Sequence, residues 1–397
     1  MMKIVNRQLP KGWDKMAHQH WCRGHRKEAI SAILNVINAY GQKKPLVFVL
    51  QFSYYLFLTG EIRAAAQVVE ASLDHYPDNT TLLLNLGVYL SRSGQYENAI
   101  VHLKKLLSLK PDDYVGFDSL CHCYYKLGLF ELATVAGKKA LHNKDKLVKV
   151  DACNVPVESP SEWLTSFDKE NVISFSLWGN NPRYLRGAVD NVLAAEHIYP
   201  GWRVRIYIDH SVPLDVQNLL LTMNVDLRLE APNQSMLQRL TWRFKVVNDA
   251  NVGRFLIRDI DSVINQREKR AVEQWIASDN WFHVMRDWWT HTDLILAGMW
   301  GGIANVLPSM ELMINNYSPP SMETPNIDQW FLRDNIWGMI RDHCLVHDRC
   351  FNTEKTISWP SDDSSSNYHV GQDVFTVNRK SQAIRLKEWI NKIKSLQ

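Results

Sequence analysis

Residues 60–77 read GEIRAAAQVVEASLDHYP, and residues 94–111 read GQYENAIVHLKKLLSLKP. Both stretches begin with a glycine, carry an alanine five positions later and end with a proline. The two copies are 34 residues apart, and Gly128 and Ala133 repeat the first two markers after the same interval. A fixed period of this length predicts a stack of similar units, none of which buries its apolar face alone.

Each marker has a physical role in a unit of two antiparallel helices. The glycine occupies the turn between the helices, where a residue without Cβ is accommodated most easily. The alanine lies where the helices cross, and the proline closes the second helix because it cannot continue the hydrogen-bond ladder. Large apolar residues recur at equivalent places: Val49, Leu83 and Phe117, and again Phe52, Leu86 and Leu120. Gly24 and Ala29 keep the same offset, which predicts an earlier unit that begins near Gln19.

The 34-residue period and its markers resemble the tetratricopeptide repeat. The resemblance implies an all-α superhelix over residues 1–145, with a concave groove that binds another molecule and is lined by the first helix of each unit. The sequence leaves open which of the tyrosines on those first helices line the groove and which are core. They are Tyr54, Tyr55, Tyr89, Tyr124 and Tyr125.

Composition sets limits on the whole chain. Its 397 residues are enough for two or three domains. The 45 basic and 42 acidic residues nearly balance, so bulk charge gives no sign of nucleic-acid binding. The N-terminus has no apolar leader, and the most apolar run, residues 46–58, is too short to cross a bilayer. We therefore expect a cytoplasmic protein, with peripheral attachment to a membrane left open.

The cysteines predict reduced thiols. There are six, and none has CxxC spacing. Cys121, His122 and Cys123 look like metal ligands, but adjacent positions of a helix point to different faces. We therefore favour packing over metal binding for these three residues.

The pattern changes after residue 145. Residues 146–170 carry charge, two prolines and weak periodicity, and they predict a connector with a short strand or two. Strands and helices alternate in the domain that follows, residues 171–397. The predicted strands are 172–177, 203–208, 225–229 and 254–257, and the predicted helices are 184–195, 214–223, 236–247 and a Lys-rich C-terminal helix at 381–397. This alternation predicts a mostly parallel sheet that binds ligands at the carboxyl ends of its strands.

Asp259 and Asp261 follow directly after the predicted strand at 254–257. Two carboxylates separated by one residue at such a strand end form a hard-oxygen site that suits Mn²⁺ or Mg²⁺. A divalent ion there neutralises the charge that grows on a diphosphate leaving group. The same triplet is common in solvated turns, so its position after a buried strand carries the argument.

Residues 171–376 resemble a nucleotide-sugar-dependent glycosyltransferase of the GT-A type. The matching pieces are VISFSLWG (172–179), GRFLIRDIDS (253–262), WFHVMRDWWTHTDLILAGMWGG (281–302) and DQWFL (328–332). The resemblance implies a Rossmann-like half for the nucleotide, a metal–diphosphate site at the Asp-x-Asp triplet and an acceptor-binding half after it. The implied cofactor is Mn²⁺ or Mg²⁺, and the implied donor is a nucleotide-diphosphate sugar.

The resemblance also assigns metal ligands and a base. Asp259 and Asp261 hold the ion, completed by a late histidine. We prefer His369 to His347, since its HVG context follows a polar loop at residues 361–367 that resembles a mobile lid. Asp328 is the first choice of catalytic base if the enzyme inverts, because an inverting displacement needs a carboxylate near the acceptor hydroxyl.

Further positions are expected to contact the nucleotide. Trp178 and Asn180 follow the first strand of the domain and lie near the base, and Asp209 takes a base or ribose hydroxyl. Arg239 and Arg243 are four residues apart on one helix face and point to the diphosphate, with an exposed basic face as the alternative.

The remaining assignments concern the phosphates and the donor sugar. Arg258 either pairs with a phosphate or forms a salt bridge at the sheet edge. Arg286 and Asp287 lie near the donor sugar, and Asp287 is a second candidate for the base. Gly298 permits close approach of backbone to the sugar. Trp300 either stacks on the sugar ring or packs in the core.

The implied function is transfer of a sugar to a glycan or protein acceptor, with the repeats binding that acceptor or a protein partner. Cell-surface polysaccharide assembly fits this description. Two alternatives stay open on the sequence: a repeat scaffold with a degenerate transferase domain, and a metal-dependent nucleotidyl- or phosphotransferase that uses the same carboxylate pair.

Overall fold

The computed structural model describes residues 9–149, 155–165, 169–319, 326–360, 369–372, 387–388 and 391. It divides into two compact units, residues 1–143 and residues 144–397. The predicted polar loop at 361–367 lies outside the described residues, as does most of the predicted C-terminal helix, of which residues 387, 388 and 391 are helical.

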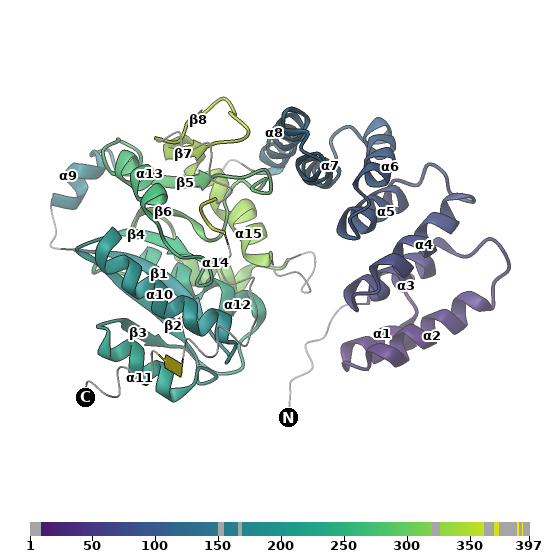
Figure 1. Ribbon diagram of the computed structural model, residues 1–397, viewed down its shortest axis with the longest axis horizontal. Helices are drawn as coiled ribbons and strands as arrows, with labels where there is room; N and C mark the ends of the chain where they lie inside the picture. The colour runs from purple at the N-terminus through teal and green to yellow at the C-terminus, as the bar shows by residue number, and fades with distance from the viewer. Residues whose placement is uncertain are drawn as a thin grey trace. The chain divides into compact units, whose positions relative to one another are not determined.

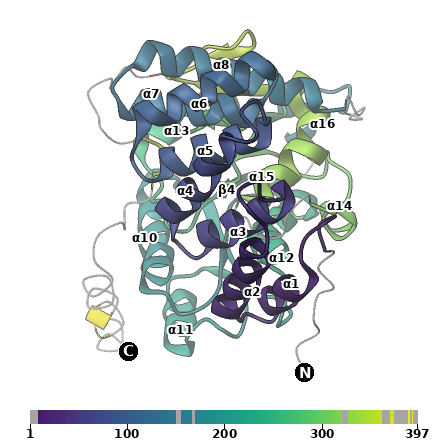
Figure 2. The ribbon, with the colours of Figure 1, turned by 90° about the vertical axis from the view of Figure 1, so that its right-hand side faces the viewer.

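The first unit is a row of helical hairpins, in which each helix packs against the next one in the chain (Figures 1 and 2). The helices are α1 (Lys15–Cys22), α2 (Arg26–Asn38), α3 (Leu46–Leu58), α4 (Ile62–Leu73), α5 (Thr80–Arg92), α6 (Tyr96–Leu109), α7 (Tyr114–Lys126) and α8 (Phe130–Leu147). The predicted helical-repeat architecture is therefore present. The first hairpin begins at Lys15 and not near Gln19, because the side chain of Asp14 caps α1 by accepting from the Ala17 amide.

The repeat markers take the predicted places. Gly24, Gly60, Gly94 and Gly128 form the turns within the four hairpins, with φ between +73° and +88°. This left-handed region favours glycine, which explains the marker. The alanine of each unit (Ala29, Ala65, Ala99 and Ala133) is completely buried, so the two helices approach closely.

Most of the tyrosines on the first helices belong to the core of the repeat unit. Tyr55, Tyr89 and Tyr124 are buried, whereas Tyr54 and Tyr125 are half-buried. Both cysteines that flank His122 on α7 are buried, and no cluster of three metal-ligating side chains occurs among the residues that the structure describes.

The apolar run at 46–58 is α3, a helix within the repeat unit. Its polar residue Gln51 is fully buried and donates to the hydroxyl of Tyr55 at 3.2 Å. Across the described part of the chain, no helix has the length and apolarity needed to cross a membrane.

The connector is partly helical. Its described residues are 146–149, 155–165 and 169–170; they contain the end of α8, the short helix α9 (Pro160–Thr165) and, at Glu170, the first residue of β1. The expected short strand stays a prediction for the other residues of the connector, which lie outside the described residues. Ser159 and Glu162 explain the helix, since the Glu162 carboxylate accepts from the amide and hydroxyl of Ser159 and so caps the first turn.

The second unit is built on one eight-stranded sheet among the described residues, in the order β3-β2-β1-β4-β6-β5-β7-β8. The strands are β1 (Glu170–Leu177), β2 (Trp202–Ile208), β3 (Asp226–Leu229), β4 (Val252–Arg258), β5 (Phe282–Arg286), β6 (Met299–Ile303), β7 (Cys344–Asp348) and β8 (Thr356–Ile357). β6 runs antiparallel to both neighbours, and the other pairings are parallel. The prediction of a mostly parallel sheet is confirmed.

Helices connect most of these strands (Figure 1); β5 and β6, and β7 and β8, are joined by segments without a helix. The helices are α10 (Pro182–Ile198), α11 (Leu214–Thr222), α12 (Met236–Thr241), α13 (Gln266–Ile276), α14 (Met310–Asn316), α15 (Ile327–Phe331) and α16 (Gly338–Ile340), with 3₁₀ turns η1 (Trp242–Asn248) and η3 (Arg341–His343) and a π turn η2 (Leu332–Trp337). Among them, α10 packs on β1 and β2.

The predicted helix at 236–247 changes type at Trp242, where α12 passes into the 3₁₀ turn η1. Two serines of β1 account for the change. The Arg243 amide donates to the Ser176 hydroxyl at 3.0 Å, and the Ser174 hydroxyl donates to the Arg243 carbonyl at 2.8 Å. Both backbone groups of Arg243 therefore bond to the sheet instead of to an α-helical ladder.

Candidate functional site

A cavity of about 460 Å³ lies beyond the carboxyl ends of β1 and β4. β1 has β2 and β3 on one side and β4 on the other, so the direction of strand progression reverses between β1 and β4. Open α/β sheets bind ligands at this kind of reversal. The cavity is lined by residues from the end of β1, the start of α10, the α12–η1 segment, the turn after β4 and the start of α15: Ser176, Leu177, Trp178, Arg183, Tyr184, Met236, Leu240, Arg243, Asp259, Ile260, Asp261, Ala297, Asn326, Asp328 and Gln329.

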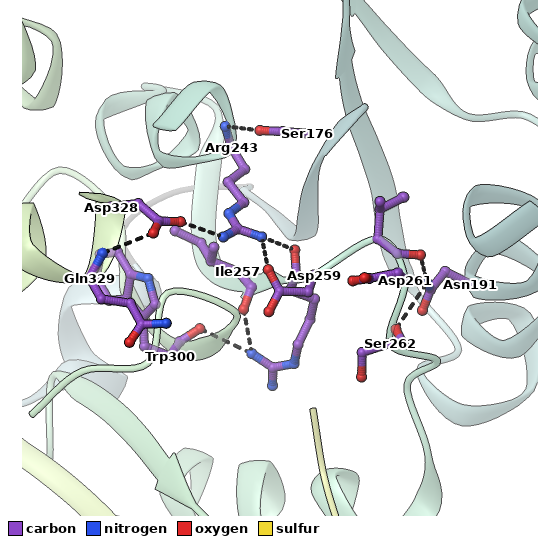
Figure 3. A network of polar contacts seen from close by, with 12 residues as sticks. Ser176, Asn191, Arg243, Ile257, Asp259, Asp261, Ser262, Trp300, Asp328 and Gln329 are labelled. Carbon is purple, nitrogen blue, oxygen red and sulfur yellow. Dashed lines mark hydrogen bonds and ion pairs between the residues drawn. The ribbon is translucent and has the colours of Figure 1, made fainter. Parts of the chain in front are cut away.

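Arg243 joins two of the lining carboxylates. Its guanidinium pairs with Asp259 and, at 3.0 Å, with Asp328 (Figure 3). Arg243 also donates to the carbonyl of Arg258 at 2.9 Å, which fixes the guanidinium at the end of β4. Arg243 is almost fully buried, which acts to lower its pKa, but the charges of Asp259 and Asp328 outweigh this effect and raise the pKa.

Asp328 is a buried carboxylate with an altered pKa. Burial raises its pKa to about 6; the charge of Asp259 acts in the same direction, and Arg243 acts against both. Its second oxygen accepts from the Gln329 amide at 2.9 Å. Asp328 is thus held in a fixed orientation with a pKa close to neutral pH, as general acid–base catalysis requires.

Asp261 and Asp259 extend from the turn that follows β4. Asp261 pairs with Arg183 from the first turn of α10. The Ser262 amide donates to the Asp259 carbonyl at 3.2 Å and closes the turn. Two carboxylates and two arginines therefore form ion pairs in the lining of the cavity.

The donor set fits a divalent ion in part. Carboxylate oxygens of Asp259 and Asp261 suit Mn²⁺ or Mg²⁺, which leave other positions to water and phosphate oxygens. His369 does not complete a three-ligand cluster with them, and no other such cluster occurs in the described ranges. Gly298 is adjacent to Asp259, since a Cβ on Gly298 would lie 2.2 Å from Asp259 Oδ2.

The structure brings Trp178, Arg243, Asp259, Asp261 and Asp328 together in this cavity. Trp178 is half-buried, and its ring meets the edge of Trp242 at a centroid distance of 6.1 Å. These five residues are the part of the sequence prediction that converges on one site.

Three predicted nucleotide contacts lie outside the lining of the cavity. Asp209 is buried, accepts from the Ser211 amide and hydroxyl, and pairs with Arg239 at 3.3 Å. Arg239 is therefore occupied by a carboxylate rather than directed to the cavity with Arg243. Asn180 is exposed.

Arg258 and Trp300 have structural roles. The Arg258 guanidinium pairs with the buried Glu268 at 2.9 Å and donates to the carbonyl of Trp300 at 3.1 Å. Arg258 does not line the cavity and forms a salt bridge, which was one of the two alternatives expected, but β4 is an inner strand and not an edge of the sheet. Trp300 is fully buried and packs edge-on against Phe244 and Phe255, so it belongs to the core and not to a sugar platform.

Arg286 and Asp287 also lie outside the cavity. The guanidinium of Arg286 donates to the carbonyls of Asp293 and Leu294 and pairs with Asp348. Asp287 is fully buried, pairs with Arg267 at 2.7 Å and accepts from the Val370 amide at 2.8 Å. With both carboxylate oxygens bound in this way, Asp287 anchors the chain outside the lining of this cavity.

The two candidate histidines have other partners. His369 stacks on Trp288 and meets the edge of His291 at a centroid distance of 4.8 Å. His347 is fully buried between His283 and Gln274, each at 2.8 Å, and burial lowers its pKa to about 4. His347 is therefore a neutral core residue.

Among the residues around the site that were not predicted are four on α10: Arg183, Tyr184, Gly187 and Asn191. Arg183, Gly187 and Asn191 follow one another at intervals of four residues, which places them on one helix face. This spacing was readable in the sequence. The sequence did not show that this helix face contacts the turn after β4, because about 70 residues separate the two segments.

No protein-family model and no curated protein matches this chain. A crystal structure of MamA overlaps it with a TM-score of 0.31 and 20% identity, over 33% of this chain and 76% of that one. MamA from Desulfovibrio magneticus RS-1 gives 0.30 and 19%, over 33% and 77%. A mutant Thermobaculum terrenum O-GlcNAc transferase gives 0.38 and 17%, over 61% of this chain and 44% of that one. These values are too low to support an inference about activity.

Proposed function

We propose that this protein is a metal-dependent glycosyltransferase that moves a sugar from a nucleotide-diphosphate sugar to a glycan or protein acceptor. One observation carries the proposal. Two carboxylates, two arginines and a buried aspartate with a pKa near 6 converge on a single cavity at the reversal point of the sheet. The sequence resemblance to the GT-A type agrees with this arrangement.

The lining of the cavity combines two kinds of side chain. Trp178, Tyr184, Met236 and Leu240 provide aromatic and apolar surface for the flat base of a nucleotide. Arg183 and Arg243 provide cations for a diphosphate, and guanidinium groups suit phosphate oxygens because they donate in a planar fork. The chemistry of the lining therefore matches both parts of a nucleoside diphosphate.

Asp259 and Asp261 would hold Mn²⁺ or Mg²⁺ through carboxylate oxygens. When bound, the ion supplies charge neutralisation for the departing diphosphate. In the structure both carboxylates pair with arginines, Asp261 with Arg183 and Asp259 with Arg243. A bound donor would offer its phosphate oxygens to these arginines, which would leave the carboxylates to hold the ion.

Asp328 is the base that accepts the proton of the acceptor hydroxyl. Its pKa near 6 leaves it mostly ionised at pH 7 while keeping it basic enough to take a proton in the transition state. Arg243 orients the carboxylate through one oxygen, and the Gln329 amide orients it through the other.

The helical hairpins bind the acceptor or a protein partner. Half-buried Tyr54 and Tyr125 on the first helices of their hairpins supply amphipathic contact surface of the kind that interfaces favour. Polysaccharide assembly at the inner face of a membrane, with peripheral attachment, is the setting proposed for this pairing.

A donor screen tests the proposal. The purified full chain is incubated with Mn²⁺ and a panel of UDP-, GDP- and CMP-sugars, and released nucleotide is measured. We expect slow release from one donor, abolished by EDTA and by Asp259→Asn with Asp261→Asn. The exposed aspartate Asp279 provides the matched control, because Asp279→Asn changes a carboxylate that does not line the cavity.

The products separate this activity from its alternatives. Nucleoside diphosphate is the product of sugar transfer from UDP- or GDP-sugars. Sugar phosphate with nucleoside monophosphate would indicate attack at phosphorus, as in a nucleotidyl- or phosphotransferase. Neither release nor binding of any donor, with binding followed by calorimetry, would leave a non-catalytic repeat scaffold as the better account.

A further inference from the structure

One face of α10 docks on the turn that carries the Asp-x-Asp carboxylates. Arg183, Gly187 and Asn191 are spaced by four residues along this helix, and each of them touches the segment 260–264. Arg183 reaches the Asp261 side chain at the edge of the cavity. The other two contacts lie deeper in the fold and involve the backbone of the turn.

Gly187 allows the close approach. A Cβ on Gly187 would lie 2.0 Å from the carbonyl oxygen of Ile260 and 3.3 Å from the Cα of Asp261. Both neighbours are backbone atoms of the turn, so a side chain here would displace the turn rather than a flexible group. Glycine in the middle of a 17-residue helix has a cost in helix stability, and this contact explains its presence.

Asn191 lies one helical turn after Gly187 on α10 and forms hydrogen bonds with the same segment after β4. Its amide nitrogen donates to the carbonyls of Ser262 at 3.1 Å (Figure 3) and Ile260 at 3.2 Å. Its side-chain oxygen accepts from the Ile264 amide at 3.1 Å. The same nitrogen lies 2.9 Å from the Gly187 carbonyl. Asn191 is fully buried, so water does not replace these bonds if they are lost.

We infer that Asn191 is a positioning residue, which together with Gly187 fixes the turn so that Asp259 and Asp261 face the cavity. We call the contacts of Gly187 and Asn191 with residues 260–264 the clamp. Its catalytic consequence rests on the proposed function, whereas the clamp itself does not. The bonds of Asn191 span Ile260, between the two carboxylates, and Ser262 and Ile264 after them. Losing them frees the turn while leaving α10 and β4 in place.

The chemistry of the clamp predicts an isosteric test. Asn191→Asp keeps the shape and the oxygen that accepts from Ile264. It replaces the donating nitrogen by an acceptor that faces three carbonyls, which is repulsive in a buried site. A side chain of the same shape is therefore not sufficient, because the clamp depends on the donating nitrogen of Asn191.

Hydrogen exchange followed by mass spectrometry measures the clamp directly. The peptide that contains residues 259–265 is compared in the wild type, Asn191→Asp and Asn191→Ala. The control is Asp190→Ala on the same helix, whose side chain pairs with Arg186 and not with the turn. We expect exchange in this peptide to rise about ten-fold or more in both Asn191 variants and to be unchanged in the control. If Asn191→Asp does not fold, Asn191→Ser, which keeps one donor, replaces it.

Calorimetry with Mn²⁺ and inorganic pyrophosphate supplies the second measurement. If Asn191 positions the carboxylates, its variants weaken binding of this probe by about ten-fold, while Asp190→Ala does not. Unchanged exchange in the Asn191 variants overturns the clamp, and faster exchange with unchanged affinity overturns its positioning role. A wild type that binds neither Mn²⁺ nor pyrophosphate counts against the proposed function instead, and the exchange result still decides the clamp.

Discussion

The guanidinium of Arg243 lies 3.0 Å from the carboxylate of Asp328, and both side chains are about 5% exposed. The pair joins a 3₁₀ turn to the start of a helix 85 residues later in the chain. Arg243 also pairs with Asp259, so one cation serves two carboxylates. Removing one partner from a buried pair leaves an uncompensated charge, which changes the properties of the group that remains.

Replacing Arg243 should therefore move the pKa of Asp328 upward. Arg243 lowers that pKa against the effect of burial, so Arg243→Gln removes the opposing contribution. A base must be ionised, and the acidic limb of the pH profile of kcat should shift to higher pH by about one unit or more. Arg243→Lys should shift it less, because it keeps the charge. A profile for Arg243→Gln that coincides with the wild type would show that Asp328 is not the base.

Asp328 should also make the stability of the protein depend on pH. The unfolded-state pKa of an aspartate is about 3.9, whereas burial raises the folded-state pKa of Asp328 to about 6. The contribution of this group is therefore fully present below about pH 4 and is lost as pH rises through 6. Asp328→Asn lacks this dependence. The free energy of unfolding of the variant minus that of the wild type should therefore rise by about 2–3 kcal/mol from pH 4 to pH 7.5.

Urea denaturation at both pH values measures this difference. Asp279→Asn, an exposed carboxylate, is the control and should follow the wild type within about 0.5 kcal/mol. If Asp328→Asn also keeps a constant offset from the wild type across this range, Asp328 titrates like an ordinary aspartate.

A methyl group on Gly298 should disturb the site more than the fold. The Cβ of Gly298→Ala would lie 2.2 Å from Asp259 Oδ2 and 2.9 Å from the Asp259 amide nitrogen. The Asp259 carboxylate must turn away, and we expect turnover to fall by about ten-fold to a hundred-fold. Gly253→Ala, where the nearest atom is a Leu164 methyl at 3.1 Å, should keep its activity. Equal turnover in the two variants would argue against a role for Asp259.

Local chemistry made much of this fold predictable. The glycine markers were readable because the turn at Gly60 or Gly94 requires positive φ, and a short repeat places it at a fixed interval. β6, which pairs with β4 and with β5, was not predicted as a strand. Its Gly301-Gly302 sequence argues against a strand, yet a Cβ on Gly302 would lie 2.5 Å from the ring of Phe282, which explains the glycine.

The site was predictable only where it follows a strand end. Trp178, Asp259 and Asp261 come directly after β1 and β4, and this position alone directs them to the cavity. Sequence could not distinguish Arg243 from Arg239, because their partners Asp328 and Asp209 are fixed by tertiary structure. The same limit applies to Arg258 and Asp287, because the tertiary structure also fixes the partners with which they form ion pairs.

Asp287 should matter for stability rather than for chemistry. It pairs with Arg267 and receives the Val370 amide, and burial raises its pKa. We expect Asp287→Ala to lower the free energy of unfolding by about 3 kcal/mol, because Arg267 loses its buried partner. The turnover of the folded fraction should change by less than about three-fold, in contrast to Asp328→Ala. A large loss of turnover at unchanged stability would restore Asp287 as a catalytic candidate.

The turn glycines of the repeats offer a test that is independent of function. Gly94 has φ +84°, and its missing Cβ would meet no atom within 4 Å, so backbone conformation alone decides the effect of a substitution. Gly94→Ala should lower the free energy of unfolding by about 1–2 kcal/mol, since an L-residue is strained in this region. Gly41 also has no atom within 4 Å, but its φ lies outside that region, so Gly41→Ala should change stability by less than about 0.5 kcal/mol. Urea denaturation of the two variants beside the wild type measures the difference, and equal stabilities would mean that the marker glycines are there for some reason other than φ.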